Sequence, residues 1–304
     1  MHAGAATSRR RAYREMTIAG VLWGTIGPAA AIVDEHTSLS ALQTSFWRLI
    51  IAVVPVAVLA IVAVRATARP SRALLLIALA IGALTGGSQL AYFAAVASAG
   101  IAIPTLIANG LGPVLTAVGQ TVVFRERPDG RTLAAMAAAL AGLGLLVLDG
   151  PGDATAGGVL LALVAAVTYA VYTLAAGPVS RRMDVTVLNA AAITGGALAM
   201  VPFVLASGGP GVSDSAAGWF ALVHLGLVVS GLAYWLYFDA ARTLPSTHLT
   251  ILTLLEPLVA TIIAVALFGE TLTLGAIVGG VLMLGAVVAL RGGHDEEPPP
   301  PPPA

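Results

Sequence analysis

The chain has 304 residues, of which 58% are hydrophobic and 10% charged, and its formal net charge at pH 7 is zero. This composition excludes an ordinary soluble domain, and the balanced charge gives no basis for nucleic-acid binding. Cysteine is absent, which excludes a disulfide framework, a thiolate metal cluster and a thiol nucleophile.

Ten long apolar segments follow one another along the chain, separated by short loops. Each is close to the roughly 20 apolar residues that a helix needs to cross a bilayer, and none alternates with the period of a barrel strand. The predicted fold is therefore an all-α polytopic membrane protein with ten transmembrane helices. The predicted helices cover residues 17–33, 40–64, 73–97, 102–123, 132–148, 157–178, 186–206, 217–238, 246–268 and 273–290.

The cationic residues are sorted into alternate loops. All fifteen are Arg, and fourteen of them lie in every other gap between the apolar segments, whereas the intervening gaps carry acidic residues such as Asp34 and Glu35. Because short Arg-bearing loops resist translocation, this pattern places those loops and both termini in the cytoplasm. Residues 1–16 are then a basic cytoplasmic tail, and residues 292–304 an acidic, Pro-rich one.

The first apolar segment has a second possible interpretation. Basic residues, an apolar stretch and then Ala29-Ala30-Ala31 are also typical of a cleaved signal peptide. Cleavage would leave nine helices and would break the internal repeat, so we expect the segment to be retained. The absence of Lys and the abundance of Ala, Gly and Val indicate a high-GC genome, and hence a bacterial inner membrane.

The chain matches itself at an offset of about 144 residues. Each half has an aromatic pair near the end of its third helix, a proline within its fourth, and a Phe-x-Glu that closes the fourth. Since five helices per half is an odd number, the second half must be inverted in the membrane, as in many secondary transporters. The predicted repeats are 17–149 and 150–291; chance similarity between two Ala- and Gly-rich helix sets is the alternative. The matching residues are Tyr92-Phe93 with Tyr237-Phe238, Pro113 with Pro257, and Phe124-x-Glu126 with Phe268-x-Glu270.

Polar residues form one face of the fourth helix and a matching face of the ninth. A polar face in hydrocarbon must meet protein or water, so the two faces indicate either a substrate pathway, which we favour, or interhelical hydrogen bonds. Pro113 and Pro257 lie beside these faces and are candidate hinges. The faces consist of Thr105, Asn109, Gly112, Thr116 and Gln120 on the fourth helix, and Thr250, Thr253 and Glu256 on the ninth.

Two charges, Arg48 and Glu256, fall within predicted helices, near the middle of the membrane. An Arg at that depth costs about 2.5–3.5 kcal/mol, so a partner or an aqueous cavity is expected. We hypothesise that the two residues share one cavity, either as an ion pair or by separately binding the carboxylate and the ammonium of a zwitterion. The alternative is a structural role at helix ends in a shifted topology.

Histidine and aromatic residues supply further candidates. His224 and His248 have side chains that titrate near neutral pH; with Glu256, His224 is the candidate for proton coupling, although a lone His is more often a packing residue. Tyr237 and Phe238 are interpreted as interfacial anchors. The remaining substrate-pathway candidates are Gln89, Tyr92, Tyr169, Tyr172, Tyr234 and Trp235.

Motifs of enzymes and ATP-driven pumps are absent from the sequence. There is no phosphate-binding Gly-Lys-Ser/Thr loop, no His-Glu-x-x-His zinc pair and no Gly-x-Ser-x-Gly elbow. We therefore expect no enzymatic activity, no cofactor, no bound metal and no ATPase subunit. The expected partners are a small-molecule substrate and the lipid bilayer.

At residues 17–291 the chain resembles the EamA family, the ten-helix group of the drug/metabolite transporter superfamily. The resemblance is carried by Phe46-Trp47-Arg48-Leu49, by Glu256-Pro257, and by the proline and Phe-x-Glu positions of the two repeats. It implies two inverted five-helix repeats around a central cavity and export of amino acids or related small metabolites. One departure is that the first repeat has Gly112 where the second has Glu256, so the halves are not chemically equivalent.

The predicted function is secondary-active export of amino acids or related metabolites by alternating access. Efflux of cationic or amphipathic drugs is a close alternative that would rely on Glu256 and the aromatic residues. A membrane-embedded enzyme or a lipid-handling protein is an alternative of a different class, for which the sequence offers no catalytic constellation.

Overall fold

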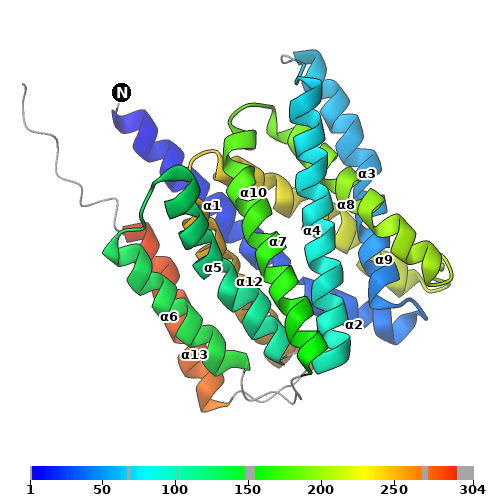
Figure 1. Cartoon of the computed structure of the whole chain (residues 1–304). Helices are drawn as coiled ribbons and strands as arrows, with labels where there is room; N and C mark the ends of the chain where they lie inside the picture. The colour runs from blue at the N-terminus through cyan, green and yellow to red at the C-terminus, as the bar shows by residue number, and fades with distance from the viewer. Residues whose placement is uncertain (1, 67–68, 101, 148–154, 269–272, 293–304) are drawn as a thin grey trace, which may run out of the picture.

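The computed structural model describes residues 2–66, 69–100, 102–147, 155–268 and 273–292, and this part of the chain is helical apart from short turns (Figure 1). The elements are α1 (His2–Trp23), α2 (Ile26–His36), α3 (Ala41–Ala66), α4 (Arg72–Ala99), α5 (Ala102–Phe124), α6 (Gly130–Val147), α7 (Ala156–Ser180), α8 (Val185–Ala206), α9 (Ala216–Val223), the π-helix η1 (His224–Leu232), α10 (Ala233–Ala241), α11 (Ser246–Thr253), α12 (Leu255–Phe268) and α13 (Leu274–Gly292).

These elements form ten apolar crossings. Within the described residues, nine helical spans are long and apolar enough to cross a membrane, and a shorter apolar helix at Leu274–Leu290 supplies the tenth. Large apolar side chains cover the outside of the bundle; Val122, Phe220 and Leu267 are each more than 70% exposed. Such a surface is stable only in lipid, and the all-α, ten-helix membrane fold is confirmed.

Three of the ten crossings are irregular. The first breaks between α1 and α2, the ninth breaks at Leu254 between α11 and α12, and the eighth runs as α9, η1 and α10. Both breaks precede a proline: Pro28 and Pro257 lack the N–H that would bond to the carbonyl four residues earlier. Pro113 also lies within a crossing, but α5 continues through it.

The first crossing begins well before the predicted residue 17. Helix α1 starts at His2, and Tyr13, Glu15 and Met16 are buried. The basic and acidic residues of α1 interrupt its apolar run, so hydropathy alone placed the start of the helix too late in the sequence. Much of the expected N-terminal tail is therefore helical and packs against α10 and α11. Residues 293–304 of the expected C-terminal tail lie outside the described residues.

The two halves repeat each other in their helix packing. Helix α4 packs against α7 and α8, and correspondingly the eighth crossing packs against α1 and α3. Helices α6 and α13, which are the fifth and the tenth crossing and so the last of each repeat, lie side by side (Figure 1). They approach so closely at Gly142 and Gly279 that a Cβ on either glycine would meet the carbonyl oxygen of the other. This reciprocal packing is that of two inverted repeats.

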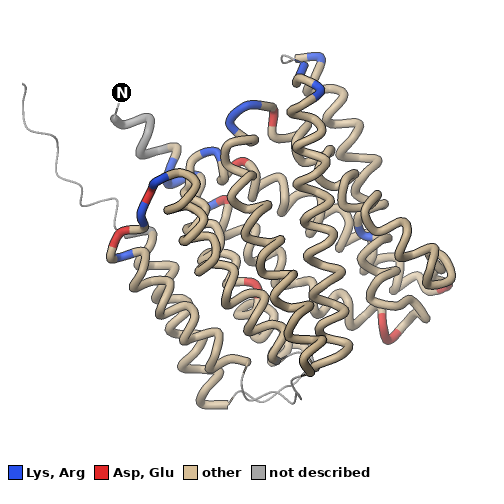
Figure 2. The backbone as a smooth tube through the Cα atoms, viewed as in Figure 1, with Lys and Arg blue, Asp and Glu red and all other residues tan. Residues whose placement is uncertain are grey.

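Charged residues gather at the two ends of the bundle (Figure 2). We call the end that carries Arg65, Arg72, Arg181 and Arg242 the basic end, and the opposite end the acidic end. The start of α1 and the end of α13 both lie at the basic end (Figure 1). Asp34, Glu35 and Asp214 are among the described residues of the acidic end; Asp149, Asp153 and Glu270 lie outside the described residues.

Candidate functional site

Arg48 is a buried cation inside the bundle. It lies seven residues after the first residue of α3, about 10 Å along the helix, and only 3% of its surface is exposed. Its Nη2 donates to Oε1 of Gln89 on α4 at 2.9 Å, whereas its Nε is buried with no hydrogen-bond partner among the described residues. A buried charge with an unsatisfied donor is costly, so this position suits a ligand that accepts hydrogen bonds. The structure thus brings together two predicted site residues, Arg48 and Gln89.

Two cavities meet at Arg48. The inner cavity has a volume of about 20 Å³, enough for one or two water molecules. The vestibule has a volume of about 270 Å³ and extends from Arg48 to Asp34, which is exposed near the acidic end. Arg48 therefore forms the floor of the vestibule and the wall of the inner cavity. Besides Arg48, the polar and aromatic lining residues are Thr85, Gln89, Asn189, Tyr234 and Phe238 in the inner cavity, and Asp34, Thr44, Ser45 and Phe93 in the vestibule.

Glu256 lies on the opposite side of this region, in the first turn of α12. It follows directly on the break at Leu254 and is half-buried. It interacts electrostatically with Arg48, yet the described residues contain no ion pair between the two, whose side-chain atoms are therefore more than 4.0 Å apart. The predicted pair is therefore not bonded, and Glu256 lines neither of the two cavities that meet at Arg48.

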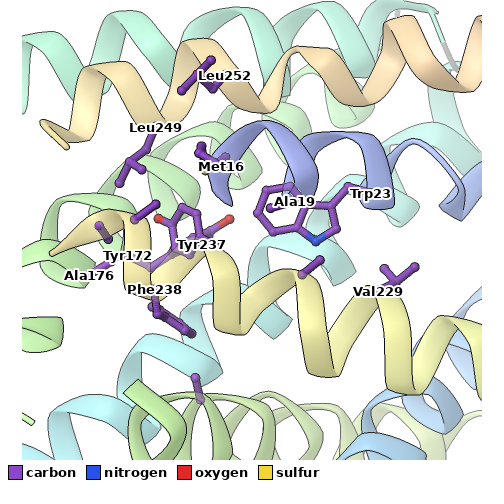
Figure 3. Close-up of a cluster of buried hydrophobic side chains, with 14 of the residues drawn as sticks. Met16, Ala19, Trp23, Tyr172, Ala176, Val229, Tyr237, Phe238, Leu249 and Leu252 are labelled. Carbon is purple, nitrogen blue, oxygen red and sulfur yellow. The ribbon is translucent and has the colours of Figure 1, made fainter. Parts of the chain in front are cut away.

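Aromatic side chains from three crossings form a cluster near Glu256; we call Trp23, Tyr169, Tyr172, Tyr234 and Tyr237 the aromatic cluster. Trp23 packs against Tyr234 and Tyr237, with ring centroids 5.2 and 5.7 Å apart, and Tyr169 packs edge-on against Tyr172 at 5.2 Å. Figure 3 shows Trp23, Tyr172 and Tyr237 in the same buried cluster. Trp23, Tyr172 and Tyr237 are buried in the core, and of the five rings Tyr234 lines the inner cavity.

Three sequence assignments of aromatic residues change. Tyr237 and Phe238 were expected to be interfacial anchors, but each is only 1% exposed and lies in the core. Because α10 continues to Ala241 before the chain leaves the bundle, these residues are farther from the helix end than the apolar run suggested. Trp235 instead donates through Nε1 to the hydroxyl of Thr186 on α8 at 3.2 Å, and it has no ring contact with the cluster among the described residues.

The polar face of α5 divides between packing and open positions. Thr105 is hydrogen-bonded to Tyr92 at 2.7 Å, and Gln120 accepts from the hydroxyl and the amide of Thr247. Thr116 is buried with no partner for its hydroxyl among the described residues. Asn109 is half-buried, and its side chain has no hydrogen bond to another described residue. Interhelical hydrogen bonds therefore account for the two ends of this face. In its middle, the side chains of Asn109 and Thr116 have no hydrogen-bond partner among the described residues.

The repeat-related positions in α5 and α12 differ for a steric reason. A Cβ at Gly112 would lie 2.7 Å from the ring of Tyr169, which is closer than real contacts allow. Glycine here lets the Tyr169 ring rest on α5, and its hydroxyl is hydrogen-bonded to Thr253 at 2.7 Å. At the equivalent position of the second half stands Glu256, so the inverted repeat presents only one carboxylate to the centre.

Proline frees a backbone carbonyl in each half of the repeat. Pro113 lacks the N–H that would bond to the carbonyl of Asn109, and Pro257 lacks the one that would bond to Thr253. These two carbonyls are 144 residues apart, the repeat offset. Unwound carbonyls within a bundle are typical ligand-binding groups of transporters; the carbonyl of Thr253, next to the break at Leu254, is such a candidate acceptor, whereas that of Asn109 lies inside the continuous helix α5.

The two histidines have different surroundings. His224 begins the π-helix η1, and its Nε2 is hydrogen-bonded at 2.8 Å to Thr25, which lies in the break between α1 and α2. His248 is buried at the basic end, with Tyr13 at 2.6 Å on Nδ1 and Thr132 at 3.0 Å on Nε2. His224 thus joins two irregular segments, whereas His248 joins three packed helices.

Asn189 on α8 is a functional candidate that sequence reasoning missed. It lines the inner cavity and is 1% exposed; its Nδ2 donates to the carbonyl of Gly231 in η1 at 2.8 Å, while its Oδ1 is buried without a partner among the described residues. The available signal was an Asn near the start of the seventh apolar segment, because an amide in hydrocarbon needs a partner.

Comparison with known proteins agrees with this architecture. The profile of the EamA-like transporter family matches residues 16–148 and again residues 156–292. The chain belongs to the EamA-like transporter family. It is therefore a multi-pass membrane transporter, and the resemblance noted in the sequence is confirmed.

Relatives of this EamA-like protein are described only as transporters. It is 29% identical over 281 residues to the uncharacterized transporter YwfM of Bacillus subtilis (strain 168), covering 89% of this chain and 90% of the relative. It is 24% identical over 292 residues to the uncharacterized inner membrane transporter YicL of Salmonella typhimurium, covering 93% and 96%. A crystal structure superposes with a TM-score of 0.76 at 22% identity, covering 92% of this chain and 96% of the other, which shows a shared fold.

Proposed function

We propose that this EamA-like protein exports amino acids or related small zwitterionic metabolites across a bacterial inner membrane by alternating access, with both termini in the cytoplasm. The observation that carries the proposal is the arrangement of Arg48 and Glu256, which are opposite charges in electrostatic reach of each other without an ion pair. A zwitterion can satisfy both, with its carboxylate on Arg48 and its ammonium on Glu256.

The surroundings of the two charges support a small substrate with an apolar part. The aromatic cluster lies beside Glu256, and the groups near Arg48 include the amide of Gln89. Rings of Tyr and Trp also attract ammonium groups through their faces. The proposed substrate pathway comprises Arg48, Gln89, Tyr92, Asn109, Thr116, Tyr169, Tyr172, Tyr234, Thr253 and Glu256.

The driving force in this proposal is a proton gradient or the gradient of the substrate itself. A half-buried carboxylate such as Glu256 can carry a proton between the two sides of a membrane, and His224 is the second proton-carrying candidate. Proton coupling predicts that export accelerates when the vestibule side is acidified; facilitated diffusion predicts no such dependence.

Counterflow in proteoliposomes tests the proposed function. Vesicles that contain the full chain are loaded with an unlabelled amino acid, and uptake of the labelled one is followed. We expect Glu256→Gln and Arg48→Gln each to lower the initial rate roughly 10- to 100-fold, because each removes a charge-assisted contact. Glu35→Gln, a change at an exposed carboxylate of the acidic end, is the matched control and should transport normally. Equal rates in all four proteins would contradict the proposed site.

Efflux of cationic compounds is the second candidate, favoured by a carboxylate, Glu256, and a cluster of aromatic rings within the same bundle. In that case a dye such as ethidium would drive counterflow and amino acids would not. Arg48→Gln would then leave transport unchanged, because a cation makes no use of Arg48.

A further inference from the structure

Two residues that line the inner cavity carry buried polar atoms of opposite hydrogen-bonding character. One atom is the Nε–H of Arg48, a donor, and the other is Oδ1 of Asn189, an acceptor; neither has a partner among the described residues. The orientation of the Asn189 amide follows from its other end, since only Nδ2 can donate to the carbonyl of Gly231. An unpaired donor and an unpaired acceptor therefore belong to the wall residues of one cavity.

Leaving both atoms unsatisfied is unfavourable. A buried donor or acceptor without a partner costs about 1–3 kcal/mol, more when the group is charged. Natural proteins keep few such atoms, and those that persist often belong to binding sites. The cost at Asn189 is avoidable, because a Leu or Val would fill the same space on α8. A ligand that donates a hydrogen bond at this point explains why the position carries an amide.

The rest of the cavity wall restricts the size of that ligand group. Gly82 and Gly86 on α4 face α8 so closely that a Cβ at Gly82 would meet the backbone of Ala192, and one at Gly86 would lie 3.0 Å from the carbonyl of Gly196. The volume of about 20 Å³ accommodates a group the size of a hydroxyl or a methyl. The other lining side chains near Asn189, such as Ile193 and Met200, are apolar.

From these features we infer that Asn189 is a specificity-determining residue that selects substrates with a short side chain bearing a hydroxyl group. The inference rests on the proposed function, in which Arg48 binds the substrate carboxylate. Asn189 Oδ1 then accepts from the side-chain hydroxyl while Arg48 Nε–H donates to the carboxylate. An apolar side chain of the same shape would leave the Asn189 oxygen unpaired, and it would be transported less well.

A pair of isosteric amino acids isolates this contact. L-threonine and L-valine differ by a hydroxyl in place of a methyl, and their initial counterflow rates are compared at concentrations far below saturation in the same proteoliposomes. We expect the full-length protein to prefer threonine about tenfold, the effect of one buried hydrogen bond. Asn189→Leu should lower the threonine-to-valine ratio to about one or below. Because the ratio is taken within one preparation, it is independent of the fraction of folded protein.

Matched variants separate recognition from packing. Thr194→Val, also on α8 but bonded to the carbonyl of Ala190, should keep the wild-type ratio. If Asn189→Leu does not yield folded protein, Asn189→Ser, whose shorter hydroxyl reaches less far, should lower the ratio at least threefold.

Three outcomes would overturn the inference. Equal rates for threonine and valine in the wild type would remove the selectivity while leaving amino-acid export intact. If the wild-type preference for threonine persists in Asn189→Leu and only the melting temperature falls, the Asn189 amide binds a structural water and does not select the substrate. Absence of counterflow for every amino acid would remove the proposed function itself, and this inference with it.

Discussion

The basic and acidic ends of the bundle differ in how their helices are joined. At the basic end, side chains connect helices that are distant in sequence: Arg11 donates to Asp239 at 2.9 Å, and His248 joins Tyr13 on α1 to Thr132 on α6. At the acidic end, the described residues enclose the vestibule of about 270 Å³ that leads to Arg48.

The links at the acidic end are also of another kind. Trp47 donates to the carbonyls of Pro210 and Gly211, and the amide of Gln43 donates to that of Gly209. These bonds attach a loop to the start of α3 and do not close the vestibule. In a protein built from inverted repeats, the two ends are related by the repeat, so a difference between them describes one conformational state. In this structure the vestibule lies at the acidic end, and side-chain hydrogen bonds join the helices at the basic end; we interpret this as a state open at the acidic end and closed at the basic end.

The largest expected effect concerns which end faces the outside. Alkaline phosphatase, which is active only after export, is fused at the α8–α9 loop near Pro210, or at the α7–α8 loop near Arg182. We expect full activity from the first fusion and background activity from the second, because Arg-bearing loops stay in the cytoplasm. The opposite result would reverse the sides, and the open vestibule would then face the cytoplasm.

A large effect is expected from His248, whose two hydrogen bonds join helices at the basic end. His248→Ala removes both buried bonds, each worth about 1 kcal/mol, and should shift the equilibrium toward closure of the acidic end by up to about 30-fold. Because the chain has no cysteine, Ala30→Cys in the vestibule can be labelled with a membrane-impermeant maleimide without background. The labelling rate of Ala30→Cys should fall when His248→Ala is added, at most by about 30-fold.

A second reporter makes that result specific. Leu244→Cys lies at the basic end and is buried in this state, so its labelling by a permeant maleimide should rise in the His248→Ala background. A fall at one end without a rise at the other would mean local distortion instead of a change of state. Unchanged labelling at both ends would show that His248 does not hold the basic end closed.

Comparison of sequence and structure shows which of these features were predictable. Hydropathy and Arg spacing predict the ten crossings, because each crossing needs apolar side chains along its own length whatever the helix packs against. The intramembrane position of Arg48 predicted a partner or a cavity, and Arg48 bonds to Gln89 where two cavities meet. The packing role of His248 is confirmed, but its partners Tyr13 and Thr132 could not be predicted, because they come from other helices and leave no local pattern.

Other features depend on packing alone and escaped prediction for that reason. The π-helix η1 has no proline or glycine signature distinct from its neighbours, and it is recognised only by its backbone hydrogen bonds, such as that from the N–H of Ala233 to the carbonyl of Val228. The early start of α1 was hidden because its charged residues are satisfied by Asp239 on a distant helix. Asn189 was missed because its unpaired Oδ1 and its place in a cavity wall depend on residues from other helices.

The smallest effect is expected from the ion pairs at the surface of the basic end. Asp239 contacts Arg11 at 2.9 Å and Arg242 at 3.6 Å, but both arginines are about half exposed, and water and salt weaken such pairs. Asp239→Asn should therefore lower Ala30→Cys labelling no more than about threefold, and less in high salt than in low salt. The same measurement as for His248→Ala, repeated at two ionic strengths, compares the two kinds of link directly. An effect of Asp239→Asn that equals that of His248→Ala and is insensitive to salt would mean that the charged network, and not the buried histidine, keeps the basic end closed.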